Sequence, residues 1–230
     1  MRLYPRIPHL PGSRVGPAER YAAPAFTARA TVAADDDRVI VTEKLDGSCV
    51  ALVGAAAGIE ARGRDGGLCA ASRNDGRRGF AAWVAARAAR LAAHVAPGER
   101  VMIEWLALAH GTRYALPHGP AVVIDGFAAD GARWGFDAVV ARAAALALPT
   151  PAVLHDGAAL AVELALARLG ARGHHGALDP AEGVMYRLER GARVRGLAKL
   201  VRPGKIDGRY LADHTGGEHV WNSWHDDGAP

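Results

Sequence analysis

The stretch from Val39 to Val50, VIVTEKLDGSCV, constrains the fold more than any other part of this chain. Its β-branched apolar residues, and the apolar run CVALV that overlaps its end, are typical of buried strands. Between the two runs stands Asp46-Gly47, a dipeptide typical of tight turns. The sequence therefore predicts strands at about 38–43 and 48–53, joined as a hairpin that carries Lys44 on a rigid support.

Lysine is rare in this chain. Only three of its 28 Lys and Arg residues are lysines, at positions 44, 199 and 205. A guanidinium group stays protonated and cannot act as a nucleophile, whereas an amine can. Retention of lysine in an arginine-rich chain indicates a position that arginine cannot fill, so Lys44 is a candidate nucleophile. Taken alone, an exposed lysine on a hairpin is the commoner interpretation.

Length and composition exclude several classes of protein. A chain of 230 residues can bury a sizeable core, and its formal charge of +4 is a modest bias towards anionic partners such as nucleic acid. Its two cysteines, Cys49 and Cys69, predict neither a disulfide framework nor a metal cluster. The N-terminus is not a secretory signal, and no apolar stretch approaches membrane-spanning length. We expect a soluble, cytoplasmic protein with no membrane partner.

The positions of proline, glycine and polar residues, and the periodicity of the apolar residues, predict the domain organisation. Residues 1–37 are predicted to be an N-terminal arm of extended chain and loops rather than core, because they contain several prolines and polar residues. Residues 38–204 form the main domain, and residues 205–230 a tail that packs on it or extends from it. Further strands are expected at about 58–62, 101–108, 121–127, 182–189 and 193–201. Helices are expected at about 79–95, 136–147 and 157–169, the last with Asp156 as its N-cap and Gly170 as its stop.

Four short motifs follow one another along the main domain. They are EKLDGS at 43–48, IEWLALAHGTRY at 103–114, EGVMYR at 182–187 and LAKLVRPG at 197–204. In this order they resemble the motifs of the covalent nucleotidyltransferase superfamily, which comprises ATP-dependent RNA and DNA ligases and RNA capping enzymes. The first motif alone arises by chance fairly often, so the resemblance rests on the ordered set. It implies an α+β fold, the nucleotidyltransferase (ATP-grasp-like ligase) fold of antiparallel sheets with flanking helices.

The resemblance also implies roles for the charged residues of these motifs. Lys44 would attack the α-phosphate of ATP and become lysyl-AMP, with Glu43 near the adenine edge and Glu104 on the ribose. Glu182 would face Mg²⁺ or Mn²⁺, and Lys199 would contact phosphate. Phosphoryl transfer depends on such neutralisation of charge. The reactive amine also needs a lowered pKa, which we expect Lys199, the metal and the arginines to supply.

Four further residues are assigned to the nucleotide from the first motif and the loop after it. Asp46 and Gly47 shape the turn, and Asp46 is also a candidate contact to the nucleotide. Arg73, in SRN at 72–74, resembles a short basic motif that binds phosphate in ligases. Arg62 competes for that role, because an arginine fork matches phosphate in either place.

Two features depart from the family pattern. Asp125 in VIDGF resembles an acid that in RNA ligases follows the motif seen here as IEWLALAHGTRY, either as a structural acid or as a ligand contact. Ile124 precedes it where an adenine-stacking aromatic is usual, so Phe127 is the candidate substitute. Val201 stands where many ligases carry a second lysine, and the neighbouring Arg202 is the candidate replacement.

The short tail indicates which branch of the superfamily is nearest. DNA ligases and capping enzymes append an OB-fold domain after the motif seen here as LAKLVRPG, but only 26 residues follow Gly204. The resemblance therefore favours a minimal type-2 RNA ligase-like enzyme without an OB domain, which would join RNA 5′-phosphate and 3′-hydroxyl ends through lysyl-AMP and an adenylylated RNA end. A DNA nick-sealing ligase, a GTP-dependent capping guanylyltransferase and a non-catalytic nucleic-acid-binding descendant of the fold stay open.

Two questions about this ligase are left open by the sequence. One is whether a separate end-healing enzyme is a partner. The other is the N-terminal segment YPRIPHLPGS at 4–13, which resembles a segment of some bacterial and phage RNA ligase-like proteins and receives no role from the sequence.

Overall fold

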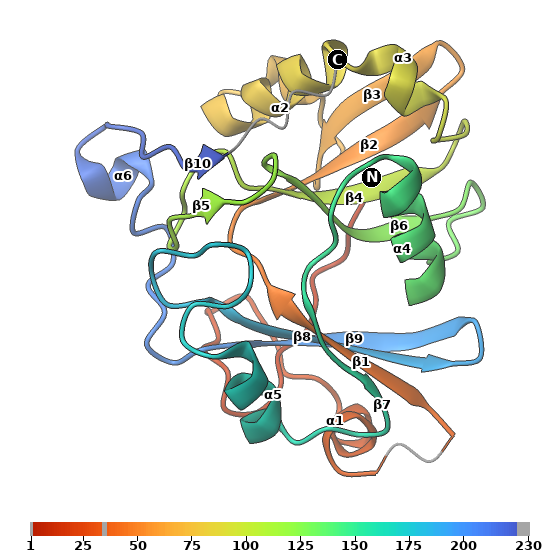
Figure 1. Ribbon diagram of the computed structural model, residues 1–230, viewed down its shortest axis with the longest axis vertical. Helices are drawn as coiled ribbons and strands as arrows, with labels where there is room; N and C mark the ends of the chain where they lie inside the picture. Colours follow the sequence, from red (N-terminus) through yellow and green to blue (C-terminus); the bar gives the residue numbers. More distant parts are fainter. Residues whose placement is uncertain (1, 34–35, 225–230) are drawn as a thin grey trace.

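Two four-stranded antiparallel sheets frame the computed structural model, which describes residues 2–33 and 36–224 (Figure 1). The lower sheet of Figure 1 has the order β7–β1–β8–β9, with strands Val153–Gly157, Arg38–Lys44, Gly183–Arg190 and Arg193–Val201. The upper sheet has the order β3–β2–β4–β6, with strands Gly58–Gly63, Ser48–Ala55, Arg100–Trp105 and Ala121–Phe127. The predicted α+β class of antiparallel sheets with flanking helices is confirmed.

Lys44 does not lie on a hairpin, so that expectation was wrong. β1 pairs with β7 and β8, whereas β2 pairs with β3 and β4. The two strands therefore belong to different sheets, and residues 45–47 carry the chain from the lower sheet to the upper one. Gly47 suits this crossing because a Cβ there would lie 2.5 Å from the carbonyl oxygen of Trp105.

Helices cover the outer face of each sheet (Figure 1). The upper sheet packs against α2 (Asp75–Ala85), α3 (Ala88–Ala92) and α4 (Phe136–Ala145) through a core that includes Phe80, Leu91 and Trp105. The lower sheet packs against α1 (Pro24–Thr31) and α5 (Val162–Leu169) through a core that includes Tyr186. No helix among the described residues is long and apolar enough to span a membrane.

Two predicted helices have different bounds in the structure. The helix expected at 79–95 is divided into α2 and α3, because Arg87 leaves the helical conformation at φ −121° and ψ 13° and lets α3 turn along β3. The helix expected at 157–169 begins only at Val162, and Asp156 is not its N-cap. Asp156 lies in β7, where it accepts a hydrogen bond from Arg38 Nε at 2.6 Å. Pairing of β7 with β1 continues to Gly157, the first residue of the predicted helix.

The N-terminal segment contributes to the core, contrary to the prediction of an arm made of loops. Its backbone runs beside β9, with Leu10 N–H donating to the Lys199 carbonyl at 2.8 Å and Lys199 N–H donating to the Pro8 carbonyl at 2.9 Å. Leu10 is fully buried in the lower core, and α1 follows. Its prolines lack N–H groups, which suits a segment at the sheet edge. A single apolar residue between prolines gives no periodic signal, so the sequence did not reveal this packing.

The described part of the C-terminal tail, residues 205–224, also lies against the domain. It contains α6 (Ala212–Thr215) and β10 (Ser223–Trp224), which pairs in parallel with β5 (Ala115–Leu116). The buried side chain of Asn222 accepts from Tyr114 N–H at 2.8 Å and donates to the Leu106 carbonyl at 2.6 Å. This amide attaches the tail to the loop after β4.

Replacement of Leu10 by alanine tests whether the N-terminal segment belongs to the core. We expect Leu10→Ala to lower the free energy of unfolding by about 2 to 5 kcal/mol, because it leaves a cavity in a fully buried position. Urea denaturation measures the change. Leu164→Ala on the exposed face of α5 is the matched control and should change stability by less than about 0.5 kcal/mol. Equal stability of the two variants would contradict the packing described for Leu10.

Candidate active site

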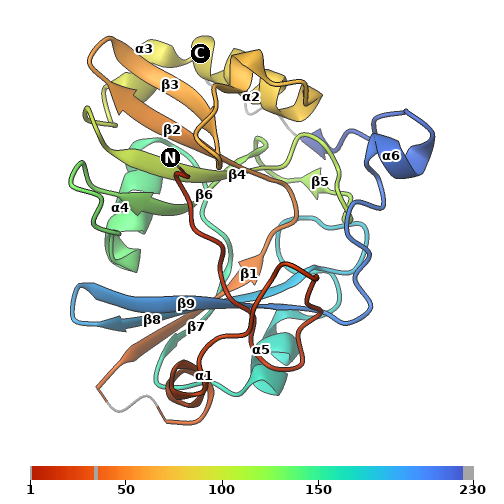
Figure 2. The ribbon, with the colours of Figure 1, turned by 180° about the vertical axis from the view of Figure 1, so that it is seen from behind.

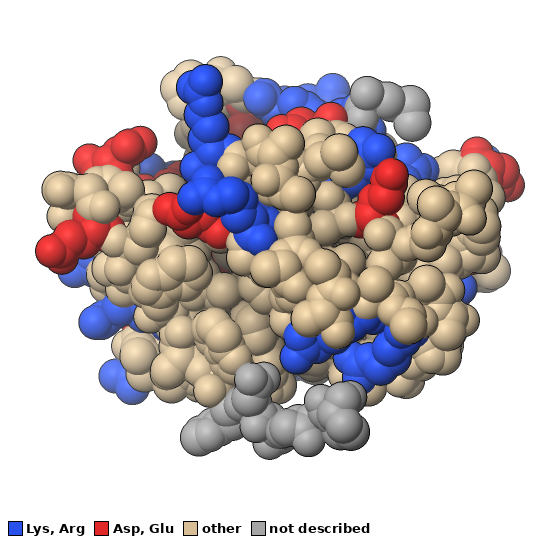
Figure 3. All heavy atoms as spheres, turned by 90° about the horizontal axis from the view of Figure 1, so that it is seen from above, with Lys and Arg blue, Asp and Glu red and all other residues tan. Residues whose placement is uncertain are grey.

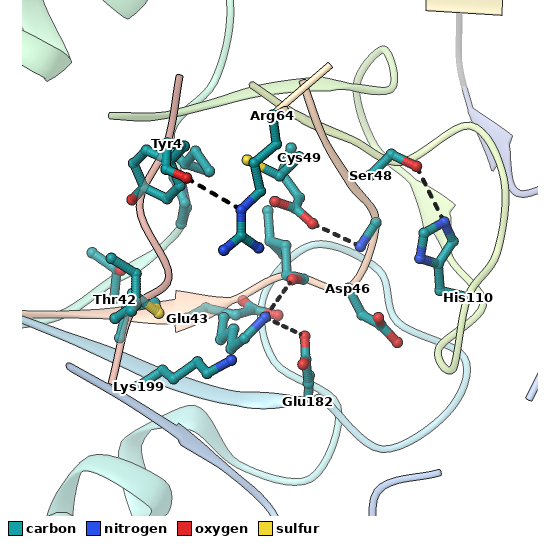
Figure 4. Close-up of a pocket in the computed structure, with 18 of the residues that line it drawn as sticks. Tyr4, Thr42, Glu43, Asp46, Ser48, Cys49, Arg64, His110, Glu182 and Lys199 are labelled. Atoms are coloured by element: carbon teal, nitrogen blue, oxygen red, sulfur yellow. Dashed lines mark hydrogen bonds and ion pairs between the residues drawn. The ribbon is translucent and has the colours of Figure 1, made fainter. Parts of the chain in front are cut away.

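A cavity of about 870 Å³ lies between the two sheets. Seven of the residues expected to act on the nucleotide line it: Glu43, Lys44, Asp46, Gly47, Glu104, Glu182 and Lys199. They come from β1, the crossing turn, β4, the start of β8 and β9, and Figure 4 shows Glu43, Asp46, Glu182 and Lys199 gathered in this space. Motifs far apart in sequence therefore meet here.

Lys44 ends β1 and extends into the cavity. Its Nζ donates to Glu182 Oε2 at 2.7 Å, because Glu182 immediately precedes β8, where Gly183 is the register partner of Lys44. Burial lowers the pKa of Lys44, but the negative charges of Glu182, Glu104 and Asp46 outweigh it and raise the pKa above its ordinary value. We had expected neighbouring cations to lower this pKa. In the ligand-free protein the carboxylates dominate, and the amine is protonated.

The two glutamates beside Lys44 are unusual acids. Burial raises the pKa of Glu182 to about 7 against the opposing charge of Lys44. Burial raises the pKa of Glu104 on β4 to about 7 in the same way. Glu104 Oε1 also accepts a hydrogen bond from Gly47 N–H at 2.9 Å, which connects β4 to the crossing turn. Both carboxyl groups therefore titrate near neutral pH and lie within one small charged cluster.

Asp46 is held from three sides. Its Oδ2 accepts from Gly111 N–H at 2.8 Å and from the buried Nζ of Lys205 at 2.7 Å, and its own N–H donates to the Tyr114 hydroxyl at 3.1 Å. Lys205 also donates to the Thr112 hydroxyl. The aspartate thus anchors the crossing turn. Lys205 was missed at the sequence level, although its rarity as a lysine was a signal.

Glu43 is a buried carboxyl group with one satisfied oxygen. Oε2 accepts from His174 N–H at 2.7 Å, while Oε1 has no hydrogen-bond partner among the described residues. Burial raises the pKa of this carboxyl group. Gly173, at φ +66°, lies so close that a Cβ would be 2.0 Å from Oε1. Only glycine therefore allows the loop before His174 to pack on Glu43.

Lys199 on β9 is neutralised by the N-terminal segment. Its Nζ donates to Glu19 Oε1 at 2.6 Å, and the other oxygen of Glu19 lies 3.0 Å from His9 Nε2. Although burial opposes ionisation, the hydrogen bonds from Lys199 and His9 lower the pKa of Glu19 to about 2. The Ser13 hydroxyl lies 2.6 Å from His9 Nδ1, on the other side of the ring. This chain of contacts orients Lys199.

Arg64, Arg77 and Arg187 line the cavity, in place of the two arginines that we expected. Arg77 pairs with Asp65 and Arg187 with Asp125, whereas Arg64 has no ion pair among the described residues. Arg64 follows β3, and its backbone and side chain both bond the N-terminal segment, with Leu3 N–H donating to the Arg64 carbonyl at 2.9 Å and Arg64 Nε donating to the Tyr4 carbonyl at 3.3 Å (Figure 4). Arg62 instead pairs with Glu60 at 2.7 Å. Arg73 lies exposed in the loop before α2 and does not line the cavity.

Three other candidates also lie away from the cavity wall. Asp125 is fully buried, and its Oδ1 accepts from Arg187 on β8 at 2.8 Å, so it bridges the two sheets as a structural acid does. Phe127 packs edge-on against Tyr4, with ring centroids 6.1 Å apart. Arg202 donates to the Ala171 carbonyl at 3.1 Å. The N-terminal segment covers the end of β6, and Phe127 therefore packs against this segment instead of facing the cavity.

Several cavity residues had no signal in the sequence. Tyr4, Pro5 and Ile7 of the N-terminal segment line it, as do Met185 of β8 and His110 of the loop after β4. They are neutral residues to which the sequence motifs around them gave no role, and long-range packing brings them here.

A family model described as RNA ligase matches residues 37–201 of this chain. The chain belongs to the RNA ligase family. That span includes β1 with Lys44, β4 with Glu104 and β8 to β9 with Lys199, the strands that build the cavity. No curated protein matches the sequence.

Solved structures of RNA ligases have a similar fold. A mutant of Naegleria gruberi RNA ligase with ATP and Mn is 14% identical, with a TM-score of 0.54, over 73% of this chain and 50% of that one. A second mutant with ATP and Mn is 13% identical, with a TM-score of 0.54, over 93% and 62%. An archaeal ATP-dependent RNA ligase is 15% identical, with a TM-score of 0.50, over 86% and 48%. The chain thus spans about half the length of these ligases, and the likeness is one of fold.

The titration of Glu104 gives a test by pH. Between about pH 4.5 and about pH 7, the Glu104 carboxyl group is protonated in the folded protein but ionised in the unfolded chain, because its pKa is raised on folding. Its contribution to stability is present at lower pH and is lost as the pH rises through this window, by on the order of 3 kcal/mol. Glu104→Gln should remove this loss in urea unfolding measured from pH 4 to pH 8. Glu163→Gln, at an exposed glutamate of α5, is the control. A wild-type pH dependence in Glu104→Gln would contradict the burial effect.

Proposed function

We propose that this chain is an ATP-dependent RNA ligase that joins RNA 5′-phosphate and 3′-hydroxyl ends through lysyl-AMP and an adenylylated RNA end. The observation that carries this proposal is the position of Lys44. One of three lysines in the chain, it enters an inter-sheet cavity beside Glu182 in a member of the RNA ligase family.

The cavity offers a site for each part of ATP. Its volume of about 870 Å³ is within the usual range for small-molecule sites. The unpartnered Oε1 of Glu43 can accept a hydrogen bond from the amino group of adenine. Glu104 can accept from ribose hydroxyls. Lys199 and Arg64 supply positive charge to the phosphates, and Arg64 adds a fork that matches phosphate oxygens.

Lys44 Nζ is the nucleophile in the proposed first step. The nitrogen lone pair forms a bond to the α-phosphorus of ATP as the bond from that phosphorus to the bridging oxygen breaks. The electron pair of the broken bond leaves with pyrophosphate, and the amine loses its proton, so a phosphoramide remains on Lys44. Lys199 and Arg64 stabilise the negative charge on the phosphate oxygens during this exchange.

The proton on Lys44 controls this step. Only the neutral amine attacks, yet the surrounding carboxylates keep the ligand-free amine protonated. Glu182 Oε2, at 2.7 Å, is the carboxylate that accepts a hydrogen bond from the amine, and its negative charge holds the proton on Lys44. The negative phosphates of ATP do not favour loss of the proton from Lys44, because negative charge stabilises the protonated amine. A change in the charge of Glu182 is therefore required.

The residues fit a divalent cation that is bound together with the nucleotide. The described part of the chain holds no group of three or more His, Cys, Asp or Glu side chains placed for a metal ion. Mg²⁺ and Mn²⁺ commonly use one or two carboxylates together with substrate phosphates, and Glu182 in the cavity wall supplies such a carboxylate. The cation would neutralise phosphate charge and draw the Glu182 carboxylate away from Lys44.

The later steps require RNA at the same site. In the second, an oxygen of the RNA 5′-phosphate attacks the phosphorus of lysyl-AMP, and the amine of Lys44 leaves. In the third, a 3′-hydroxyl oxygen attacks the 5′-phosphate, its proton is lost, and AMP leaves. Figure 3 shows the Lys and Arg side chains of the upper face in several separate groups, some of them beside Asp and Glu.

Labelling of Lys44 tests the first step. Incubation with α-labelled ATP and Mg²⁺ or Mn²⁺ should give a labelled band in denaturing electrophoresis, stable to alkali and lost in acid as for a phosphoramide. Lys44→Ala should abolish the label. Lys44→Arg keeps a cation opposite Glu182 and should also abolish it, which separates chemistry from folding. No label from ATP or GTP, or an undiminished label in either variant, would reject the mechanism. A label from GTP alone would favour a capping enzyme, and sealing of DNA rather than RNA a DNA ligase.

Glu182 is tested by its dependence on metal. Glu182→Ala should lower the rate of labelling at least roughly tenfold and raise the metal concentration needed for half-maximal labelling. Glu163→Ala on α5 controls for the loss of an exposed glutamate. A wild-type rate with an unchanged metal titration would rule out the metal role of Glu182.

A further inference from the structure

The N-terminal segment separates two cavities. Its residues Pro5 and Ile7 line the inter-sheet cavity on one side and a second cavity, of about 490 Å³, on the other. Figure 2 shows this segment, in red, running from the side of the upper sheet down to the lower sheet. The second cavity therefore adjoins the nucleotide cavity with only one stretch of chain between them.

Three arginines line the second cavity: Arg2, Arg6 and Arg20. All three are exposed, and none forms an ion pair within the part of the chain that the structure describes. The cavity has one acid, Glu19, whose charge is already balanced by Lys199 at 2.6 Å and by the hydrogen bond from His9. The wall is consequently positive, with three guanidinium groups free to bind an anion.

The backbone around this cavity is held in place. Arg6 Nη1 donates to the Ala18 carbonyl at 2.7 Å, His9 N–H donates to the Arg20 carbonyl at 2.8 Å, and Ala22 N–H donates to the His9 carbonyl at 2.7 Å. These bonds tie residues 6–9 to residues 18–22. Arg6 and Arg20 therefore extend from a braced loop, and their backbone positions do not need to be ordered when a ligand binds. Arg2 precedes Leu3, whose N–H donates to the Arg64 carbonyl at 2.9 Å.

From this arrangement we propose that the arginine cavity binds a backbone phosphate of the RNA strand whose end occupies the nucleotide cavity. Guanidinium forks match phosphate oxygens bidentately, and phosphate contacts position a strand without reading its sequence. Glu19 connects the two sites, because it belongs to the arginine cavity and orients Lys199 of the nucleotide cavity. The inference rests on the proposed function and gives the N-terminal segment the role of an RNA-positioning element.

Salt-dependent RNA binding tests this site. The protein carrying Arg2→Gln together with Arg20→Gln is titrated with a fluorescent single-stranded RNA bearing a 5′-phosphate, at several salt concentrations. The side chains of Arg2 and Arg20 make no hydrogen bond among the described residues, so the fold should be kept. Arg6→Gln is made separately, because Arg6 also holds the Ala18 carbonyl. Arg193→Gln, an exposed arginine at the tip of the β8–β9 hairpin, is the matched control.

The expected result is a severalfold rise in Kd for RNA in the Arg2 and Arg20 double variant. The slope of log K against log salt should fall in magnitude by about 0.7 for each phosphate that the variant no longer neutralises. The control should bind as the wild type does, and labelling of Lys44 by ATP should be unchanged in all variants.

Two results would overturn the proposal. One is an unchanged Kd and salt slope in the double variant. The other is impaired labelling by ATP in the double variant, which would assign the arginines to the triphosphate of ATP. Absence of any label in the wild-type protein would overturn the proposed function instead, and the binding titration would still decide whether the arginine cavity holds RNA.

Discussion

The crossing of the chain between the sheets at residues 45–47 is the constraint on which the site depends. Asp46 fixes this turn through Gly111 and the buried Lys205, and Gly47 N–H bonds Glu104 of the opposite sheet. The crossing therefore sets the position of Lys44 relative to the carboxylate of a different sheet. Charged groups held in this way need little rearrangement when a reaction begins, which is the main electrostatic advantage of an enzyme site.

A second connection between the sheets lies farther along β8. Arg187, four residues after Gly183, pairs with the fully buried Asp125 of β6. Removal of one member of such a pair leaves an uncompensated buried charge, which is strongly destabilising. The N-terminal segment adds a third connection through Arg64 and Lys199. The cavity is thus bounded by contacts that join the two sheets at separate places, and the sheets act as one support.

The charge balance around Lys44 is negative in the ligand-free protein. Glu182, Glu104 and Asp46 raise the pKa of the amine, whereas Lys199, the cation expected to lower it, is itself neutralised by Glu19. Under the proposed function, the nucleophile is therefore stored in its unreactive, protonated form. Reactivity would depend on groups that arrive with the substrate, which limits unproductive chemistry by a free amine.

The sequence by itself determined the strands, the order of the motifs and the candidate nucleophile, because these are local properties. β-branched runs specify strands. A rare lysine in an arginine-rich chain is a candidate nucleophile whichever residues pack around it. Glu43, Glu104, Glu182 and Lys199 could be selected in the same way, since each lies within a short motif. Only the tertiary structure decided that Arg64 faces the cavity while Arg62 pairs with Glu60, and that the strands beside Lys44 belong to different sheets. These outcomes depend on which distant segments pack together. The N-terminal segment covers β6 and binds Arg64, and no local sequence pattern encodes that packing.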